Sequence, residues 1–229
     1  MNDRPGEATD DVLELRDVRA GHGAVEALHG VSLRLPMGST VAVLGRNGAG
    51  KSTLLGAIAG LVRVRSGSIR WRGRDLGALS AARRAAAGIT LVPDRHNVFE
   101  SMTVEENLAV FAGGGPTDAA HEVFPELAGM ADRRAGTLSG GERQMVALSH
   151  VLLRPSPVVL LDEPSRGLAP AAVARISHAI EAIADSDRLV VIVEQYLHDV
   201  LRLADLAVVL RRGEVAFAGP PAELANQPS

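Results

Sequence analysis

The chain has 229 residues, of which 46% are hydrophobic, so it is long enough to bury a substantial core as one compact unit. Its 24 basic and 27 acidic residues leave a formal net charge of -3, which argues against nucleic acid as a partner. The absence of cysteine excludes disulfides, thiolate metal sites and cysteine nucleophiles, and it is compatible with a reducing compartment.

The first eleven residues are polar and acidic and lack the apolar segment of a signal peptide or anchor. We therefore expect residues 1–11 to form a disordered tail. No apolar run approaches the roughly 18 residues that a transmembrane helix needs. Any role at a membrane must then come through a partner.

From residue 12 onward, short β-branched runs alternate with helical patterns, which predicts an α/β fold. Some interior runs are apolar throughout, as expected of parallel strands covered on both faces, whereas two runs alternate in polarity. We expect a mainly parallel core sheet with an antiparallel β flank. The predicted strands are residues 12–18, 31–35, 40–44, 68–72, 89–92, 158–161, 189–193, 206–210 and 215–218. The predicted helices are residues 51–61, 103–111, 140–153, 170–183 and 195–203.

A phosphate-binding loop is predicted between the strand at 40–44 and the helix that begins at Lys51. Its spacing and its position between strand and helix fit the P-loop pattern and argue against the alternative of an ordinary glycine-rich turn that caps a helix. The glycines let backbone N–H groups converge on phosphate oxygens at the positive end of the helix. Lys51 is expected to neutralise the β and γ phosphates of ATP, and the Ser52 hydroxyl to bind Mg²⁺. The predicted nucleotide-binding residues are Gly45, Arg46, Asn47, Gly48, Ala49, Gly50, Lys51, Ser52 and Thr53.

Residues 95–153 contain no convincing strand, so we expect a helical subdomain inserted into a nucleotide-binding core of residues 12–94 and 154–229. Gly113, Gly114, Gly115 and Pro116 predict a break inside it.

Two acids follow the apolar run at 158–161. The carboxyl ends of parallel strands share one edge of a sheet, so Asp162 and Glu163 are expected to lie beside the P-loop. Asp162 would then hold Mg²⁺, and Glu163 would act as the general base on the attacking water. On their own, the two acids could equally begin a turn or cap a helix.

A third motif comes about twenty residues before these acids, and it reads Leu138-Ser139-Gly140-Gly141-Glu142-Arg143-Gln144. Ser139 and Glu142 predict a capping box for the helix at 140–153. A capping box does not explain two adjacent glycines, which weaken a helix but leave N–H groups open to an anion. Here the chain resembles the ABC ATPases, whose signature is LSGGQ or LSGGE. The resemblance extends from about Val12 to Leu224.

The resemblance implies that the signature of one subunit meets the γ-phosphate held by the P-loop of another. Ser139, Gly140 and Gly141 would then act in trans, and a dimer is implied. Residues 165–170 are similar to the family's D-loop, with Arg166 at a position that is usually small or apolar.

Three positions depart from the commonest family pattern: His22 stands at the adenine-stacking position, Asp94 at the Q-loop glutamine and Gln195 at the switch histidine. His22 could be a plain loop residue, and Asp94 a solvated acid. The family pattern makes Asp94 a candidate Mg²⁺ ligand and Gln195 a candidate catalytic residue. The segments 92–99, 102–108, 167–170 and 193–195 resemble the branched-chain amino-acid importer ATPases, a pattern that urea and short-amide importers share.

The resemblance therefore implies an ATPase that converts ATP to ADP and phosphate with Mg²⁺ and drives uptake of branched-chain amino acids or a related small polar solute. Expected partners are a second ATPase subunit, identical or not, transmembrane permeases and, indirectly, a solute-binding protein, at the cytoplasmic face of the cell membrane. Phe99 and Met102 either join the core or line a groove for the permease. The alternatives are an exporter ATPase and, further away, a soluble ABC ATPase without a transport role. A P-loop kinase or GTPase that acts alone on a small molecule is a third alternative, and the signature and the D-loop argue against it.

Overall fold

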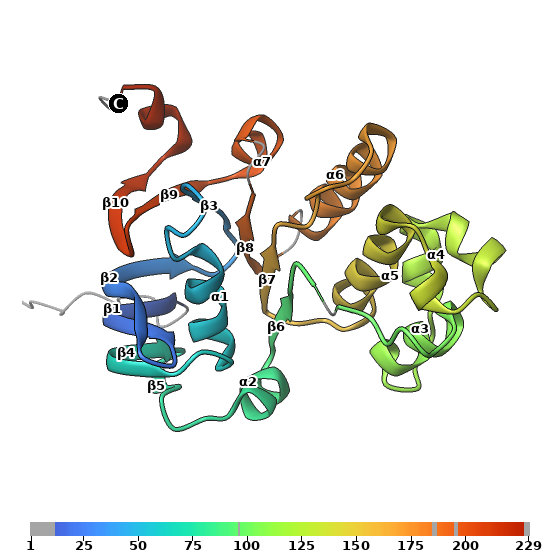
Figure 1. Cartoon of the computed structure of the whole chain (residues 1–229), viewed down its shortest axis with the longest axis horizontal. Helices are drawn as coiled ribbons and strands as arrows, with labels where there is room; N and C mark the ends of the chain where they lie inside the picture. Colours follow the sequence, from blue (N-terminus) through green and yellow to red (C-terminus); the bar gives the residue numbers. More distant parts are fainter. Residues whose placement is uncertain (1–11, 96, 185–186, 195–196, 227–229) are drawn as a thin grey trace, which may run out of the picture.

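The structure is a computed structural model that describes residues 12–95, 97–184, 187–194 and 197–226 (Figure 1). The tail predicted at 1–11 and the start of the helix predicted at 195 lie outside the described residues.

The strands of the described residues form two sheets. A four-stranded antiparallel sheet has the order β2-β1-β4-β5, and a six-stranded sheet has the order β10-β9-β3-β8-β7-β6. In the larger sheet, β9, β3, β8, β7 and β6 are parallel, and β10 pairs antiparallel at the edge. The strands are β1 (Val12–His22), β2 (Val25–Pro36), β3 (Thr40–Leu44), β4 (Val64–Trp71), β5 (Arg74–Asp75), β6 (Ile89–Val92), β7 (Val158–Asp162), β8 (Leu189–Val193), β9 (Leu206–Arg211) and β10 (Glu214–Gly219).

Helices α3, α4 and α5 gather at one end of the molecule, beyond β6 and β7 (Figure 1). The helices are α1 (Lys51–Ala59), α2 (Ala81–Ala87), α3 (Val104–Ala112), α4 (Asp118–Val123), α5 (Gly140–Leu153), α6 (Pro170–Ala184) and α7 (Leu197–Leu203), with 3₁₀ turns at η1 (Pro125–Met130), η2 (Ala135–Thr137) and η3 (Pro221–Asn226). Among the described helices, none is both long and apolar enough to cross a membrane.

The parallel strands are apolar throughout because they send alternate side chains into two different cores. Val41 and Val43 of β3 join one hydrophobic cluster, whereas Ala42 and Leu44 join the other. The same alternation holds along β7 and β8. One cluster lies against α1 and the antiparallel sheet, and the other against α3, α5 and α6.

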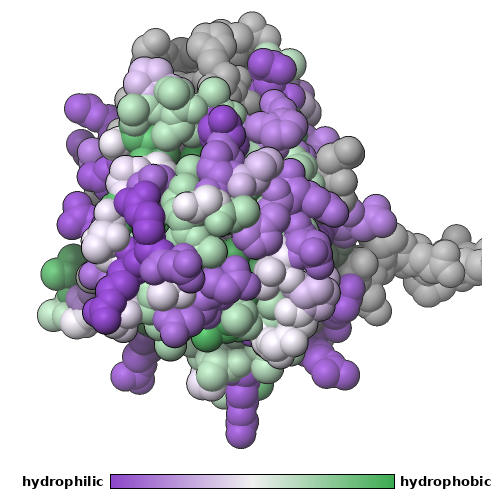
Figure 2. Space-filling model, turned by 90° about the vertical axis from the view of Figure 1, so that its right-hand side faces the viewer, coloured by the Kyte–Doolittle hydropathy of each residue, from purple (hydrophilic) through white to green (hydrophobic). Residues whose placement is uncertain are grey.

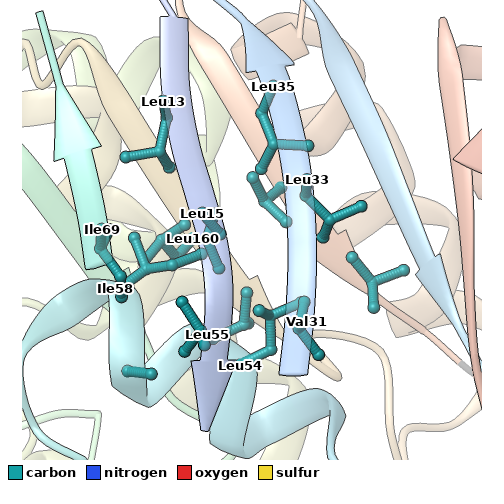
Figure 3. Packing of buried hydrophobic residues seen from close by; sticks show 14 of the residues in the cluster. Leu13, Leu15, Val31, Leu33, Leu35, Leu54, Leu55, Ile58, Ile69 and Leu160 are labelled. Atoms are coloured by element: carbon teal, nitrogen blue, oxygen red, sulfur yellow. The ribbon is translucent and has the colours of Figure 1, made fainter. Parts of the chain in front are cut away.

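Helix α1 shares its cluster with both sheets, which fixes the loop that precedes it. Leu54, Leu55 and Ile58 of α1 meet Leu15 of β1 and Leu160 of β7 in this cluster (Figure 3). All five side chains are at most 1% exposed. The start of α1 is therefore held against the end of β3 by packing on two sides.

The α/β class, the parallel core and the antiparallel flank are confirmed. The helix at 140–153 has the predicted bounds, and Gly113 ends α3 with a left-handed φ of 62°. The sequence did not predict the short elements β5, α2 and α4. Between residues 97 and 153, the described chain forms helices, 3₁₀ turns and one isolated bridge, between Thr103 and Arg134. The division into a nucleotide-binding core and a helical subdomain stays a prediction.

Asn107 of α3 holds the segment that leads into this helix. Its side chain is fully buried; its amide donates to the carbonyls of Phe99 and Thr103, and its Oδ1 accepts from the Phe99 N–H at 2.8 Å. Phe99 is 48% exposed, so a buried amide orders a segment that carries an exposed aromatic ring. Figure 2 looks onto this end of the molecule, where hydrophobic residues form patches between polar ones.

We expect Asn107→Leu to lower the free energy of unfolding by about 1–3 kcal/mol, because it leaves the Phe99 N–H without its partner and removes one of two donors from each of the Phe99 and Thr103 carbonyls. Urea unfolding followed by circular dichroism measures the change. Val110→Ala, at a 46% exposed position of the same helix, is the control and should change stability by less than about 0.5 kcal/mol. Equal stability of Asn107→Leu and the parent would contradict this role.

Candidate active site

The strand order brings the P-loop and the two acids to one edge of the sheet. β3 pairs with β8 and β8 with β7, all in parallel, so Leu44, Val193 and Asp162 end at the same edge. In open α/β sheets, this edge is where ligands bind.

The P-loop backbone has a shape that two of its glycines require. Gly45 has a φ of 149°, and a Cβ there would lie 2.4 Å from the Leu210 carbonyl oxygen. Gly50 has a φ of 104°, and its Cβ would lie 2.8 Å from the Ala27 carbonyl oxygen. The loop is pressed against β9 and β2, whereas Arg46, Asn47 and Gly48 are exposed at its tip. Ala49 and Thr53 are buried.

Lys51 is 5% exposed, and its ammonium group folds back over the loop. The Nζ atom donates to the Gly45 carbonyl at 2.8 Å and lies 4.0 Å from the Glu163 Oε1 atom. A buried ammonium group thus stands beside the loop, where the resemblance places the phosphates.

Ser52 connects the P-loop to the acids. Its Oγ atom donates to the Oδ1 atom of Asp162 at 3.1 Å. Burial raises the pKa of Asp162 above its ordinary range, the Ser52 hydrogen bond opposes this, and the neighbouring charge of Glu163 adds to the increase. Asp162 is therefore a buried carboxyl whose charged form is disfavoured by desolvation, and it lies beside the exposed hydroxyl of Ser52.

Glu163 is held in an uncommon backbone conformation. Its φ is 48°, its side chain is 8% exposed, and its N–H donates to the Val193 carbonyl at 2.8 Å. Left-handed backbone at a residue other than glycine is concentrated at functional sites, where the surroundings enforce it. The carboxylate lies between two cations, with Lys51 on one side and the Nη1 atom of Arg166 at 3.0 Å on the other.

Asp94 joins this group through Arg166. The Nη1 atom of Arg166 donates to the Asp94 Oδ2 atom at 3.1 Å, and Arg95 approaches the same oxygen at 3.7 Å. The predicted Q-loop acid is therefore close to Glu163 at this edge of the sheet, and an arginine is its nearest partner.

Glu194 belongs to the same edge, and the sequence analysis gave it no role of its own. It is 4% exposed, and its Oε1 atom accepts from the Ser165 N–H at 2.7 Å. The signal was present in the sequence, because Glu194 follows the apolar strand β8 as the two acids follow β7.

The signature residues lie at the start of α5, on the opposite side of the core strands from α1 (Figure 1). The capping box is confirmed, because the Ser139 Oγ accepts from the Glu142 N–H, and the Glu142 carboxylate accepts from the Ser139 N–H at 2.7 Å. Gly141 has a packing reason as well, since a Cβ there would lie 2.7 Å from the Ala172 Cβ of α6. Ser139 and Gly140 are exposed and are not brought to the P-loop of this chain.

Two further candidates differ in what the structure shows. His22 is exposed at the end of the β1–β2 hairpin, opposite Val25, which is 71% exposed. A ring that stacks on adenine needs such an open position. The structure does not test this role of His22, which stays a prediction. Gln195 lies outside the described residues.

The donor set at Ser52 and Asp162 fits Mg²⁺. A hydroxyl and a buried carboxylate of raised pKa are hard oxygen donors in a place that a cation would stabilise. Within the described part of the chain, no three His, Cys, Asp or Glu side chains gather as a metal site. Mg²⁺ here would need water and nucleotide phosphates as its other ligands, which is its usual coordination in ATPases.

Sequence comparison gives the family. Residues 28–166 match the family described as ABC transporter. The chain is 39% identical to the high-affinity branched-chain amino acid transport ATP-binding protein BraG of Pseudomonas aeruginosa, over 95% of this chain and 96% of that protein. It is 40% identical to the probable branched-chain amino acid transport ATP-binding protein LivF of Archaeoglobus fulgidus, over 93% and 94%.

Structure comparison agrees with the sequence. A nucleotide-free ATP-binding cassette from an ABC transporter superposes with a TM-score of 0.80 at 26% identity, covering 94% of each chain. Another cassette, in its ADP conformation, gives 0.79 at 26% identity over 95% of this chain and 96% of that chain. The chain therefore belongs to the ABC transporter family, as an ATP-binding subunit that hydrolyses ATP.

Proposed function

We propose that this chain drives an importer of branched-chain amino acids or of a related small polar solute. The observation that carries the proposal is its identity of about 40%, over nearly the whole length, to two ATP-binding proteins of branched-chain amino acid transport from a bacterium and an archaeon. Other importers are among its relatives, such as the thiamine import protein ThiQ of Cereibacter sphaeroides at 35% identity. The solute is therefore the part of the proposal that most needs a test.

To test it, the chain is co-purified with its native permeases and placed in lipid vesicles. ATP hydrolysis is then measured with one solute at a time, each presented with the cognate binding protein. Stimulation of ATP hydrolysis by leucine, isoleucine or valine supports the proposal. If only urea, an amide or thiamine stimulates hydrolysis, the proposed solute is wrong and that compound takes its place. If the vesicles export a substrate, the proposed direction of transport is wrong.

In the proposed mechanism, the P-loop backbone and Lys51 bind the β and γ phosphates, which Lys51 reaches by leaving the Gly45 carbonyl. Ser52 and Asp162 would hold Mg²⁺, and the chemistry that the metal would supply is neutralisation of charge on the phosphates. Glu163 accepts a proton from the attacking water. Asp94 and Gln195 complete the γ-phosphate side, and His22 stacks on the adenine.

The second half of the site comes from another subunit in this proposal. The exposed Ser139 and Gly140 stand at the positive end of α5 and can donate to an anion across an interface. The partner is a second copy or a related subunit. Residues 95–153 work as a helical subdomain in this proposal. The half-exposed Phe99 lies on a surface that binds the permease. Binding to the permease holds the chain at the cytoplasmic face of the membrane.

Glu163→Gln is expected to lower kcat for ATP hydrolysis by about 10²–10⁴, the usual contribution of general base catalysis, while ATP still binds. Phosphate release and the binding of a fluorescent ATP analogue measure the two effects. Glu122→Gln, on the exposed face of α4, is the control. Wild-type turnover by Glu163→Gln would show that another group activates the water.

The trans arrangement predicts complementation between two inactive variants. Lys51→Ala should be inactive because its P-loop is damaged, and Ser139→Arg because its signature is blocked. In an equal mixture, half of the dimers contain one intact P-loop facing one intact signature, so about a quarter of the parental activity should return. Steady-state ATPase assays measure it. If cross-linking shows mixed dimers and no activity returns, the site is built within one chain.

A further inference from the structure

One arginine nitrogen joins two carboxylates that come from distant parts of the chain. The Nη1 atom of Arg166 lies 3.1 Å from Asp94 and 3.0 Å from Glu163. Asp94 follows β6, on the segment that leads to the α3 end of the molecule, and Glu163 follows β7. Arg166 therefore links the segment after β6 to the catalytic edge.

The burial of these groups makes the link more than a surface ion pair. The Glu163 side chain is 8% exposed and that of Asp94 27%, whereas that of Arg166 is 47% exposed. Charge-assisted hydrogen bonds to partly buried carboxylates are stronger than those between exposed groups. Arg95 offers a contrast, because its side chain is 79% exposed and lies 3.7 Å from the same Asp94 oxygen.

The segment after β6 has further anchors nearer to α3, among them hydrogen bonds from the Gly136 N–H to the Glu100 carbonyl and from the Ala135 N–H to the Met102 carbonyl. Asn97 donates to the Gln144 side chain at 2.9 Å, and Phe99 is held by Asn107. Asp94, Asn97, Gln144 and Arg166 also line one cavity of about 360 Å³ between this segment, the start of α5 and the loop after β7. Arg166 thus lines one side of this cavity, and the segment after β6 lines another side.

We infer that Arg166 is a positioning residue that holds Asp94 and Glu163 together in the nucleotide-free chain and gives up Asp94 when Mg²⁺ and ATP bind. While Arg166 binds the Oδ2 atom of Asp94 and the Oε2 atom of Glu163, it competes for these two oxygens with a metal ion or the attacking water. The inference rests on the proposed roles of Asp94 and Glu163. It adds that this chain carries an internal cation, Arg166, that competes with Mg²⁺ for Asp94.

Two measurements test this with the full-length protein. Hydrogen exchange of the nucleotide-free chain should become about two- to fivefold faster in Arg166→Leu over residues 93–99, the factor expected for one partly exposed ion pair. The Mg²⁺ concentration that gives half-maximal binding of a fluorescent ATP analogue should fall by a similar factor. Arg95→Leu removes the same charge beside Asp94 and should change neither quantity.

Two more variants separate a link from a general effect of charge. Arg166→Lys keeps the charge but lacks the planar guanidinium, so it should exchange as fast as Arg166→Leu. In an Asp94→Asn background, Arg166→Leu should add no further exchange. Unchanged exchange in Arg166→Leu, or equal effects of Arg95→Leu, overturns the inference. Because exchange is measured without nucleotide, this outcome is independent of whether Glu163 proves to be the general base.

Discussion

The hydrogen bond from Ser52 to Asp162 joins the two halves of the nucleotide site across 110 residues of chain. It can form only because β3, β8 and β7 run parallel side by side and end at one edge. The apolar side chains that these strands send alternately into two cores hold that order in place. The same strand order also brings Lys51, Glu163 and Glu194 to this edge.

The edge concentrates negative charge in a place where water is scarce. Asp162, Glu163 and Glu194 are each at most 8% exposed, and burial raises the pKa of Asp162. In the nucleotide-free chain, Lys51 and Arg166 partly compensate, because each lies close to Glu163. Such an arrangement favours the arrival of a cation and of phosphates that reorganise these contacts, and it lowers the stability of the empty site.

The sequence predicted the parts of the molecule whose signals are local. The P-loop and the capping box of α5 each depend on residues within about ten positions, so their spacing indicates them. The acids after β7 became candidates only because a P-loop was predicted beside them. The short helix α2 was missed, because a seven-residue run rich in alanine and arginine has no clear apolar period and is stabilised instead by Ser80 and by Arg84, which donates to α1 carbonyls.

Contacts between distant segments could not be predicted in this way. Nothing in the spacing of Asp94 and Arg166 shows that they meet, since 72 residues separate them and the sheet order brings them together. For Gly141, the sequence predicted a place at an anion site but not a packing contact. Its contact with Ala172 requires the packing of α5 on α6, which no local pattern contains.

The central claim is that Asp162 is unfavourable in the empty site and needed in the loaded one, and Asp162→Asn tests both parts. A raised pKa means that this carboxyl stabilises the fold only when protonated, and this contribution is lost as pH rises through its folded pKa. At pH 7, the nucleotide-free variant should therefore be more stable than the parent, by about 0.5–2 kcal/mol, the range of single stabilising substitutions. The difference should vanish below about pH 4, where aspartate is protonated in the unfolded chain as well.

The measurement is denaturant unfolding of both proteins at pH 7 and pH 3.5, with and without Mg²⁺ and ATP. We predict that Asp162→Asn is the more stable protein without ligand at pH 7 and gains less stability than the parent from Mg²⁺ and ATP together. A variant that is less stable without ligand, or that gains as much from Mg²⁺ and ATP as the parent, would contradict the account.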